Sequence, residues 1–102
     1  MKAQQRSFIA APAAAAAGFY RTAAGAEIDL VMEIPGSGLW AIEIKRGLSP
    51  ALDKGFHIAC MDLQPAHRFL VYSGCARYPH SPGLDAVSVA EMAALLRGIR
   101  AL

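Results

Sequence analysis

The sequence has few residues that can build a redox or metal-stabilised centre. Its two cysteines, Cys60 and Cys75, form no Cys-x-x-Cys pair, and no Cys/His cluster has the spacing of a zinc site. We therefore expect reduced thiols in a cytoplasmic protein. Charged residues make up only 18% of the chain against 55% hydrophobic residues, a composition that excludes an intrinsically disordered protein.

Long apolar runs and phosphate-binding loops are also missing. No segment approaches the ~20 apolar residues of a membrane-spanning helix, so we expect no membrane partner. Lys2 and Arg6 precede a run of small residues, but Pro12 and the weakly hydrophobic alanines make this start a poor signal peptide. No Gly-x-x-x-x-Gly-Lys-Ser/Thr segment is present, and we expect that this chain alone does not bind ATP in the P-loop manner.

What remains fits one α/β domain with an N-terminal extension. The 102 residues suffice for a single compact domain. Residues 1–17 are rich in alanine and are either a helix broken near Pro12 or an irregular end. Residues 18–102 form the expected domain. The net charge of +2 neither requires nor excludes a nucleic-acid partner, because such binding depends on local clusters of basic residues.

Hydrophobic periodicity and turn residues predict the elements of this domain. Strands are predicted at 18–22, 27–34, 39–46, 68–73 and 86–87, helices at 50–63 and 89–97, and a loop over 74–85. The strands on either side of Pro35-Gly36-Ser37-Gly38 form a hairpin. Ser49-Pro50 is a typical helix start, and Ser88 with Glu91 forms a capping box. The expected fold is a small mixed β-sheet with a central antiparallel hairpin, flanked by helices.

The hairpin carries the candidate site. Side chains alternate between the faces of a strand, so two sets of residues emerge on opposite faces. One face is apolar and holds Ile28, Leu30, Met32, Ile34, Trp40, Ile42 and Ile44; the other holds Glu27, Asp29, Val31, Glu33, Ala41, Glu43 and Lys45. If the turn centres on Gly36, Asp29 lies opposite Glu43 and Glu27 lies opposite Lys45. Opposed residues have Cβ atoms ~5 Å apart.

This arrangement suits metal-dependent hydrolysis of a phosphodiester. Two carboxylates this close repel each other, and one becomes protonated unless a cation lies between them. Mg²⁺, a hard cation with oxygen ligands, fits that position. Lys45 beside it can orient a water molecule or stabilise charge on a phosphate. The same residues also fit a solvated strand face, where a Glu27–Lys45 surface ion pair is worth under ~1 kcal/mol.

Several stretches of the sequence resemble a known domain. They are Phe-Tyr-Arg-Thr (19–22), Gly-Ala-Glu-Ile-Asp-Leu-Val (25–31), Ala-Ile-Glu-Ile-Lys-Arg-Gly (41–47), Phe-His-Ile-Ala (56–59) and Phe-Leu-Val-Tyr (69–72). They are similar to an uncharacterised C-terminal domain found behind the P-loop module of bacterial and archaeal AAA-type ATPases. That domain looks like a PD-(D/E)XK nuclease core, also called restriction-endonuclease-like, and the similarity runs from about residue 18 to the end.

The resemblance implies a set of roles. Asp29 and Glu43 match the acidic metal ligands of the motif, Lys45 matches its lysine, and the backbone carbonyl of Ile44 is a further metal ligand. Active members of the superfamily use Mg²⁺ and cut DNA or RNA. Two departures leave activity open here: no proline directly precedes Asp29, and the glutamate that many such nucleases carry on a preceding helix is absent. Glu27 is its candidate replacement.

Two functions therefore remain open. The first is a nuclease. The second is a catalytically inactive accessory or protein-interaction module derived from such an ATPase, with a protein partner or a homodimer formed through an exposed edge strand.

Other residues are weaker candidates. Five basic residues have two interpretations, a phosphate-contacting surface near the site or scattered solubilising charge. These residues are Arg21, Lys45, Arg46, Lys54 and Arg68. Trp40 shares a face with Ile42 and is expected in the core. His57 has no second His or Cys placed to assist it and is expected to be exposed or to have a capping role.

Overall fold

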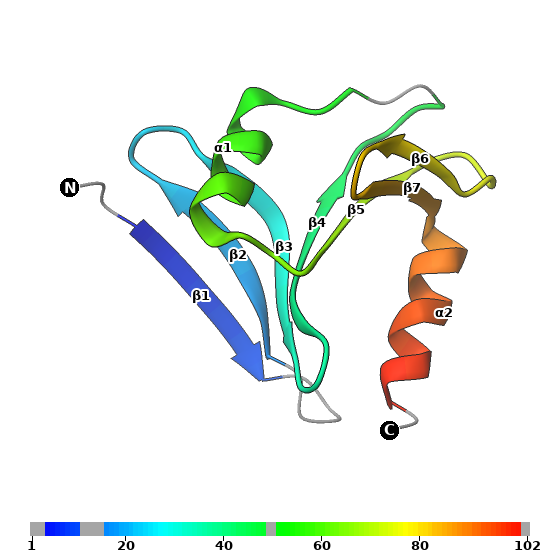
Figure 1. Cartoon of the computed structure of the whole chain (residues 1–102), viewed down its shortest axis with the longest axis horizontal. Coiled ribbons are helices and arrows are strands. Elements are labelled where there is room, and N and C mark those ends of the chain that lie inside the picture. The colour runs from blue at the N-terminus through cyan, green and yellow to red at the C-terminus, as the bar shows by residue number, and fades with distance from the viewer. Residues whose placement is uncertain (1–3, 11–15, 49–50, 101–102) are drawn as a thin grey trace.

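The computed structural model of the chain describes residues 4–10, 16–48 and 51–100, which form a mixed β-sheet and two helices (Figure 1). The strands are β1 (Gln4–Ala10), β2 (Ala16–Thr22), β3 (Glu27–Ile34), β4 (Gly38–Ile44), β5 (His67–Tyr72), β6 (Tyr78–Ser81) and β7 (Leu84–Ser88), and the helices are α1 (Lys54–Leu63) and α2 (Val89–Arg100). The strand order is β1-β2-β3-β4-β5-β7-β6. Strand β5 runs parallel to β4 and β7, and the other neighbours are antiparallel. The expected mixed α/β sheet with a central hairpin, β3–β4, is confirmed.

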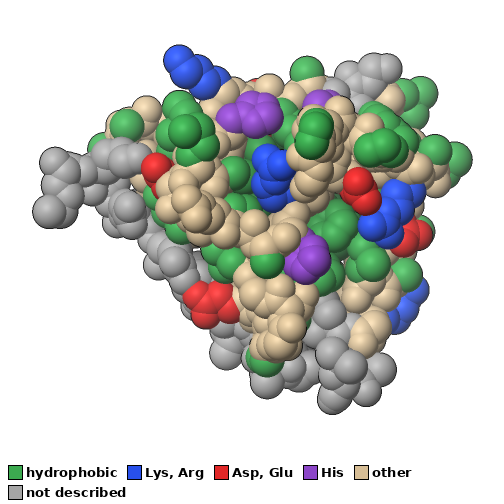
Figure 2. Space-filling model, viewed as in Figure 1, with side chains coloured by type: hydrophobic (Ala, Val, Ile, Leu, Met, Phe, Trp, Pro, Cys, Tyr) green, Lys and Arg blue, Asp and Glu red, His purple; other side chains and the backbone are tan. Residues whose placement is uncertain are grey.

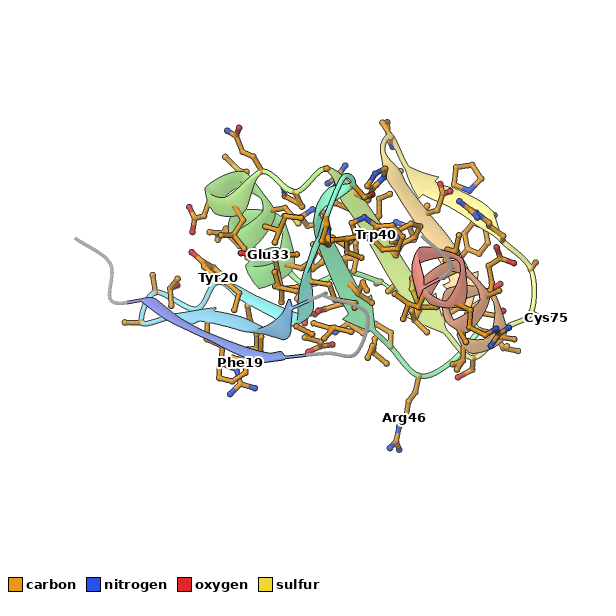
Figure 3. All side chains as sticks on the ribbon, turned by 90° about the horizontal axis from the view of Figure 1, so that it is seen from below. Phe19, Tyr20, Glu33, Trp40, Arg46 and Cys75 are labelled. Carbon is orange, nitrogen blue, oxygen red and sulfur yellow. The ribbon has the colours of Figure 1, made fainter. Side chains whose placement is uncertain are left out.

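The two helices cover opposite faces of the sheet. On β5, Leu70 belongs to the cluster under α1, whereas Phe69 and Val71 belong to the cluster under α2. Because successive residues of a strand point to opposite faces, these clusters lie on opposite sides of the sheet. Burial on both faces explains the nearly continuous apolar run of β5. Figure 3 places Trp40, which belongs to the α2 cluster, among the side chains that fill the middle of the molecule.

The N-terminal segment differs from the broken helix or irregular end that its composition suggested. Residues 4–10 form the edge strand β1, paired with β2 from Gln4↔Thr22 to Ala10↔Ala16. The helix alternative is thus wrong for this stretch, which contains one alanine, Ala10, and pairs along its whole length with the edge of the sheet. The sheet also crosses the boundary expected between residues 17 and 18, since β2 begins at Ala16. Pro12 lies outside the described residues.

Element boundaries show three further differences. Helix α1 begins at Lys54, four residues after the predicted start, and the expected cap at Ser49-Pro50 lies outside the described residues. Strand β6 occupies part of the predicted loop, because the turn at Gly83, with φ of 74°, lets it form a hairpin with β7. Helix α2 continues past the predicted end at residue 97 to Arg100. None of the helices in the described ranges is long and apolar enough to cross a membrane.

Strand β3 contains a β-bulge that breaks the expected alternation. Its register with β4 includes Leu30↔Ile42 and Met32↔Trp40, as a turn centred on Gly36 requires. Its register with β2 shifts between Tyr20↔Ile28 and Gly18↔Val31, so that Asp29 and Leu30 lie opposite the single residue Phe19. Ile28 and Val31 therefore both pack in the α1 cluster, while Leu30 packs against the α2 cluster. The prediction that Ile28 shares a face with Leu30 is wrong for this reason.

Candidate functional site

The candidate site lies where the backbone ladder between β3 and β4 ends. The last paired residues are Leu30 and Ile42. Beyond them, the Asp29 N–H donates to Oε1 of Glu43 at 3.3 Å, and the Ile44 N–H donates to Oδ2 of Asp29 at 3.0 Å. The side chain of each acid thus binds the backbone of the opposite strand. These two hydrogen bonds hold both carboxylates between the strand ends.

A pocket of about 280 Å³ opens at this point. Its lining includes all five residues expected at the site, namely Glu27, Asp29, Glu43, Ile44 and Lys45, together with Gly25, Asp53, Gly55 and Phe56. The added residues come from the β2–β3 turn and from the start of α1. The two strands therefore bring the predicted residues together, and the N-terminal end of α1 closes the pocket beside them.

Glu43 is the chemically most perturbed of these residues. It is only 4% exposed, and no other residue with a charged side chain is buried in the described part of the chain. Burial, followed by the neighbouring Asp29 carboxylate, raises the pKa of Glu43 to about 7. Near neutral pH the pocket therefore favours either a proton on Glu43 or a cation close to it.

Lys45 supplies a fixed positive charge to the pocket. Its Nζ lies 2.8 Å from Oδ2 of Asp53 and 3.8 Å from Oε2 of Glu43. The hydrogen bond to Asp53 is the main cause of a raised pKa at Lys45, so the ammonium stays charged around neutral pH. The predicted site lacks Asp53, because the predicted helix over 50–63 includes this residue. The sequence signal for Asp53 is its position eight residues after Lys45 and directly before Lys54, where α1 begins.

Glu27 and Ile44 occupy the rim of the pocket. The Oε1 atom of Glu27 lies 3.6 Å from Nε of Arg21, its paired residue on β2. Glu27 therefore makes its ion pair with Arg21 and not with Lys45, whose ammonium is bound by Asp53 from α1. The Ile44 side chain is 55% exposed. The roles of Glu27 as an additional acid and of the Ile44 carbonyl as a metal ligand stay predictions.

Two carboxylates of the pocket are candidate ligands for a divalent cation such as Mg²⁺. Among the residues that the structure describes, no group of three or more His, Cys, Asp and Glu side chains is placed to hold an ion. The pocket instead offers the two carboxylates of Asp29 and Glu43. Mg²⁺ is commonly bound through one or two carboxylates, with water and substrate phosphate completing its octahedron. A structural zinc site, by contrast, takes four protein ligands.

The expected basic residues do not gather around the pocket. Lys45 lines it, but Arg21 pairs with Glu27, and Arg68 donates to the backbone oxygen of Pro82 at 2.7 Å. Arg46 points away from the sheet (Figure 3). Figure 2 shows the Lys and Arg side chains of one face spread over it rather than clustered. The interpretation as scattered charge is the better one for this face.

Two predictions about other residues are confirmed. Trp40 is buried, and its Nε1 donates to Oγ of Ser37 at 2.9 Å. His57 is exposed on α1. Neither residue lines the pocket that contains the two acids.

Comparisons with known proteins place the chain in a family. The family described as "Domain of unknown function (DUF4143)" matches residues 3–92. The uncharacterized proteins Mb2031c of Mycobacterium bovis and Rv2008c of Mycobacterium tuberculosis are each 36% identical to the chain over 88 residues, which is 78% of this chain and 20% of each relative. The chain thus spans about a fifth of the length of these curated relatives. No solved structure matches the chain.

Proposed function

The chain belongs to the DUF4143 family, and we propose that it is a PD-(D/E)XK nuclease-like domain that hydrolyses phosphodiester bonds of DNA or RNA with Mg²⁺. One observation carries the proposal. Asp29 and Glu43 meet at the end of the β3–β4 ladder, and the Lys45 ammonium lies 3.8 Å from Glu43. Two carboxylates can hold a divalent ion, and an ammonium beside them can stabilise negative charge on a phosphate.

In this proposal each residue has a defined task. Asp29 and Glu43 would hold the ion, with the backbone carbonyl of Ile44 as a further ligand. When bound, the ion would lower the pKa of a water molecule and neutralise charge on the phosphate. Lys45 would donate hydrogen bonds to a phosphate oxygen as negative charge develops there. Glu27, on the rim, is the proposed residue to hold the attacking water. The oxygen of that water would form a new P–O bond as the bond to the leaving oxygen breaks, with the proton of the water released to solvent and a proton from solvent taken up by the leaving oxygen.

The resemblance to domains behind AAA-type ATPase modules supports a finer proposal. In this finer proposal the domain works in the cytoplasm beside such a module, and that module binds ATP. The relatives support this finer proposal only through their length, because the matched region is 20% of each of them. A protein of which the match covers a fifth has room for a second domain.

The test is cleavage of plasmid, single-stranded DNA and RNA by the purified chain, with and without Mg²⁺. We expect cleavage that needs the metal and falls at least about 100-fold in Lys45→Ala and Asp29→Ala, because both residues contact the ion or the phosphate. Arg97→Ala removes an exposed basic side chain of α2 that does not line the pocket and should keep wild-type activity. Cleavage unchanged by Lys45→Ala, or no cleavage of any substrate by the wild type, would argue against the proposal.

A second candidate function is an inactive protein-interaction module. It is favoured by two apolar side chains beside the same strand end, since Ile44 is 55% and Leu48 is 72% exposed. Calorimetric titration with Mg²⁺ and Mn²⁺ separates the two functions. Micromolar binding that disappears in Asp29→Ala supports the nuclease, whereas no binding by the wild type supports the interaction module.

A further inference from the structure

Asp53 stands out because it does not make the interaction that its position favours. It is the N-cap residue of α1, where an aspartate usually accepts a hydrogen bond from a backbone N–H of the first turn, worth about 1 kcal/mol. Its side chain makes no such bond. Its Oδ2 instead lies 2.8 Å from Nζ of Lys45. Departures from a local rule of this kind concentrate at functional sites.

Packing at the start of α1 fixes the position of Asp53. A Cβ atom at Gly55 would lie 2.6 Å from the backbone oxygen of Gly25, so the first turn of α1 lies directly against the β2–β3 turn. Phe56, which is fully buried, anchors the same turn in the core. The other partner is fixed as well, because the Lys45 N–H donates to the Val71 oxygen of β5 at 2.9 Å. Asp53 and Lys45 therefore meet from two anchored segments.

Stability alone does not explain this ion pair. The Asp53 side chain is 68% exposed, and exposed pairs of this type contribute little to folding, under about 1 kcal/mol. The pair does decide where the ammonium lies. A lysine side chain has four rotatable bonds, and the nearest alternative partner is Oε2 of Glu43 at 3.8 Å. Without Asp53, the ammonium would move onto Glu43 and occupy the oxygen that the proposed cation needs.

We propose that Asp53 is a positioning residue that holds the Lys45 ammonium beside the Asp29–Glu43 pair, free to contact a substrate phosphate and clear of the metal-binding oxygens. The catalytic part of this inference rests on the proposed nuclease function. Asp53 acts on the reaction through Lys45 and is not itself placed at the phosphate.

The first experiment uses Asp53→Asn, with Asp85→Asn as the matched control. Asp85 makes a similar ion pair with Arg77, at 3.0 Å, but lies on β7 and does not line the pocket. In Mg²⁺-dependent plasmid cleavage, we expect Asp53→Asn to lower kcat about tenfold, with KM for DNA changed less than about twofold, because misplacing a catalytic group costs rate more than affinity. Asp85→Asn should stay within about twofold of wild type. Asp53→Glu, which restores the carboxylate, should recover part of the rate.

The second experiment does not depend on activity. Crystal structures of metal-free Asp53→Ala and Asp85→Ala locate the Lys45 ammonium, which should move towards Oε2 of Glu43, 3.8 Å away in the wild type, only in Asp53→Ala. An unmoved Lys45 ammonium in Asp53→Ala overturns the inference, as does an unchanged kcat of Asp53→Asn in an active enzyme. If the wild type cuts no nucleic acid, the proposed function fails and the position of the Lys45 ammonium alone decides whether Asp53 holds it. Urea unfolding verifies that each variant is folded.

Discussion

Replacing Glu43 by glutamine tests the electrostatics of the pocket through the stability of the whole protein. The pKa of Glu43 is raised from 4.5 to about 7, mainly by burial. At 1.36 kcal/mol per pH unit, this corresponds to about 3 kcal/mol. The folded state binds the proton more tightly than the unfolded state. The stabilisation is therefore complete below pH ~4.5 and is lost as the pH rises through about 7.

Glutamine removes this pH dependence and keeps the local contact. Its Oε1 can still accept the Asp29 N–H, which donates to Glu43 at 3.3 Å in the wild type. We expect the free energies of unfolding of the two proteins to differ by about 1 kcal/mol or less at pH 5. Between pH 5 and pH 8 the free energy of unfolding of Glu43→Gln, relative to the wild type, should rise by about 2–3 kcal/mol. This is a large part of the ~5–15 kcal/mol that stabilises a typical domain. Urea unfolding in the presence of a chelator, at pH values from 5 to 8, measures the difference.

Two additions make the result decisive. Glu91→Gln changes a partly exposed carboxylate that pairs with Arg77, and its effect should stay below about 1 kcal/mol at every pH. Saturating Mg²⁺ at pH 8 should stabilise the wild type and not Glu43→Gln, since a ligand stabilises only the form that binds it. Parallel pH profiles for the wild type and Glu43→Gln without metal would refute the assignment of a buried, destabilising charge at this position.

Further predictions concern the packing of α1 and the two thiols. Gly55→Ala should lower the free energy of unfolding, measured in urea, by about 1–3 kcal/mol, because the new Cβ would lie 2.6 Å from the Gly25 oxygen. Gly98→Ala in α2 has open space around it and should be neutral or slightly stabilising. Equal effects of the two substitutions would contradict close packing at Gly55. Iodoacetamide at pH 8 should quickly label the exposed thiol of Cys75 and not that of Cys60, because burial raises the pKa of Cys60 to about 11. Mass spectrometry identifies the labelled residue. Rapid labelling of Cys60 in the folded protein would disprove its burial.

Features encoded by local sequence were predictable. The β3–β4 hairpin and its register followed from alternation and from a Pro/Gly turn, which restrict the pairing to one offset. The capping box gave the start of α2, where the Glu91 N–H donates to Oγ of Ser88 at 3.0 Å. Asp29, Glu43 and Lys45 followed from the same hairpin, because residues two apart on a strand share a face.

Features that depend on contacts between distant segments were not predictable in this way. Strand β1 exists because β2 offers it an edge, and its sequence, Gln-Gln-Arg-Ser-Phe-Ile-Ala, shows no clear strand alternation of its own. The start of α1 depends on the close approach of Gly55 to Gly25, which are thirty residues apart. Asp53 enters the pocket only because the helix begins after it. Periodicity predicts Asp53 inside the helix, and a residue in that position is not expected to contact Lys45.

The bulge in β3 explains how one short strand serves both the core and the site. With strict alternation, Ile28 would share a face with Leu30, and both would lie on the same side of the sheet. The extra residue lets Ile28 pack under α1 while Leu30 packs against the α2 cluster. The bulge lies against β2, where Asp29 and Leu30 face the single residue Phe19. On the β4 side of the same strand, the Asp29 N–H donates to the Glu43 side chain. Asp29 thus belongs both to the irregularity that lets β3 bury residues on both faces and to the pair of acids.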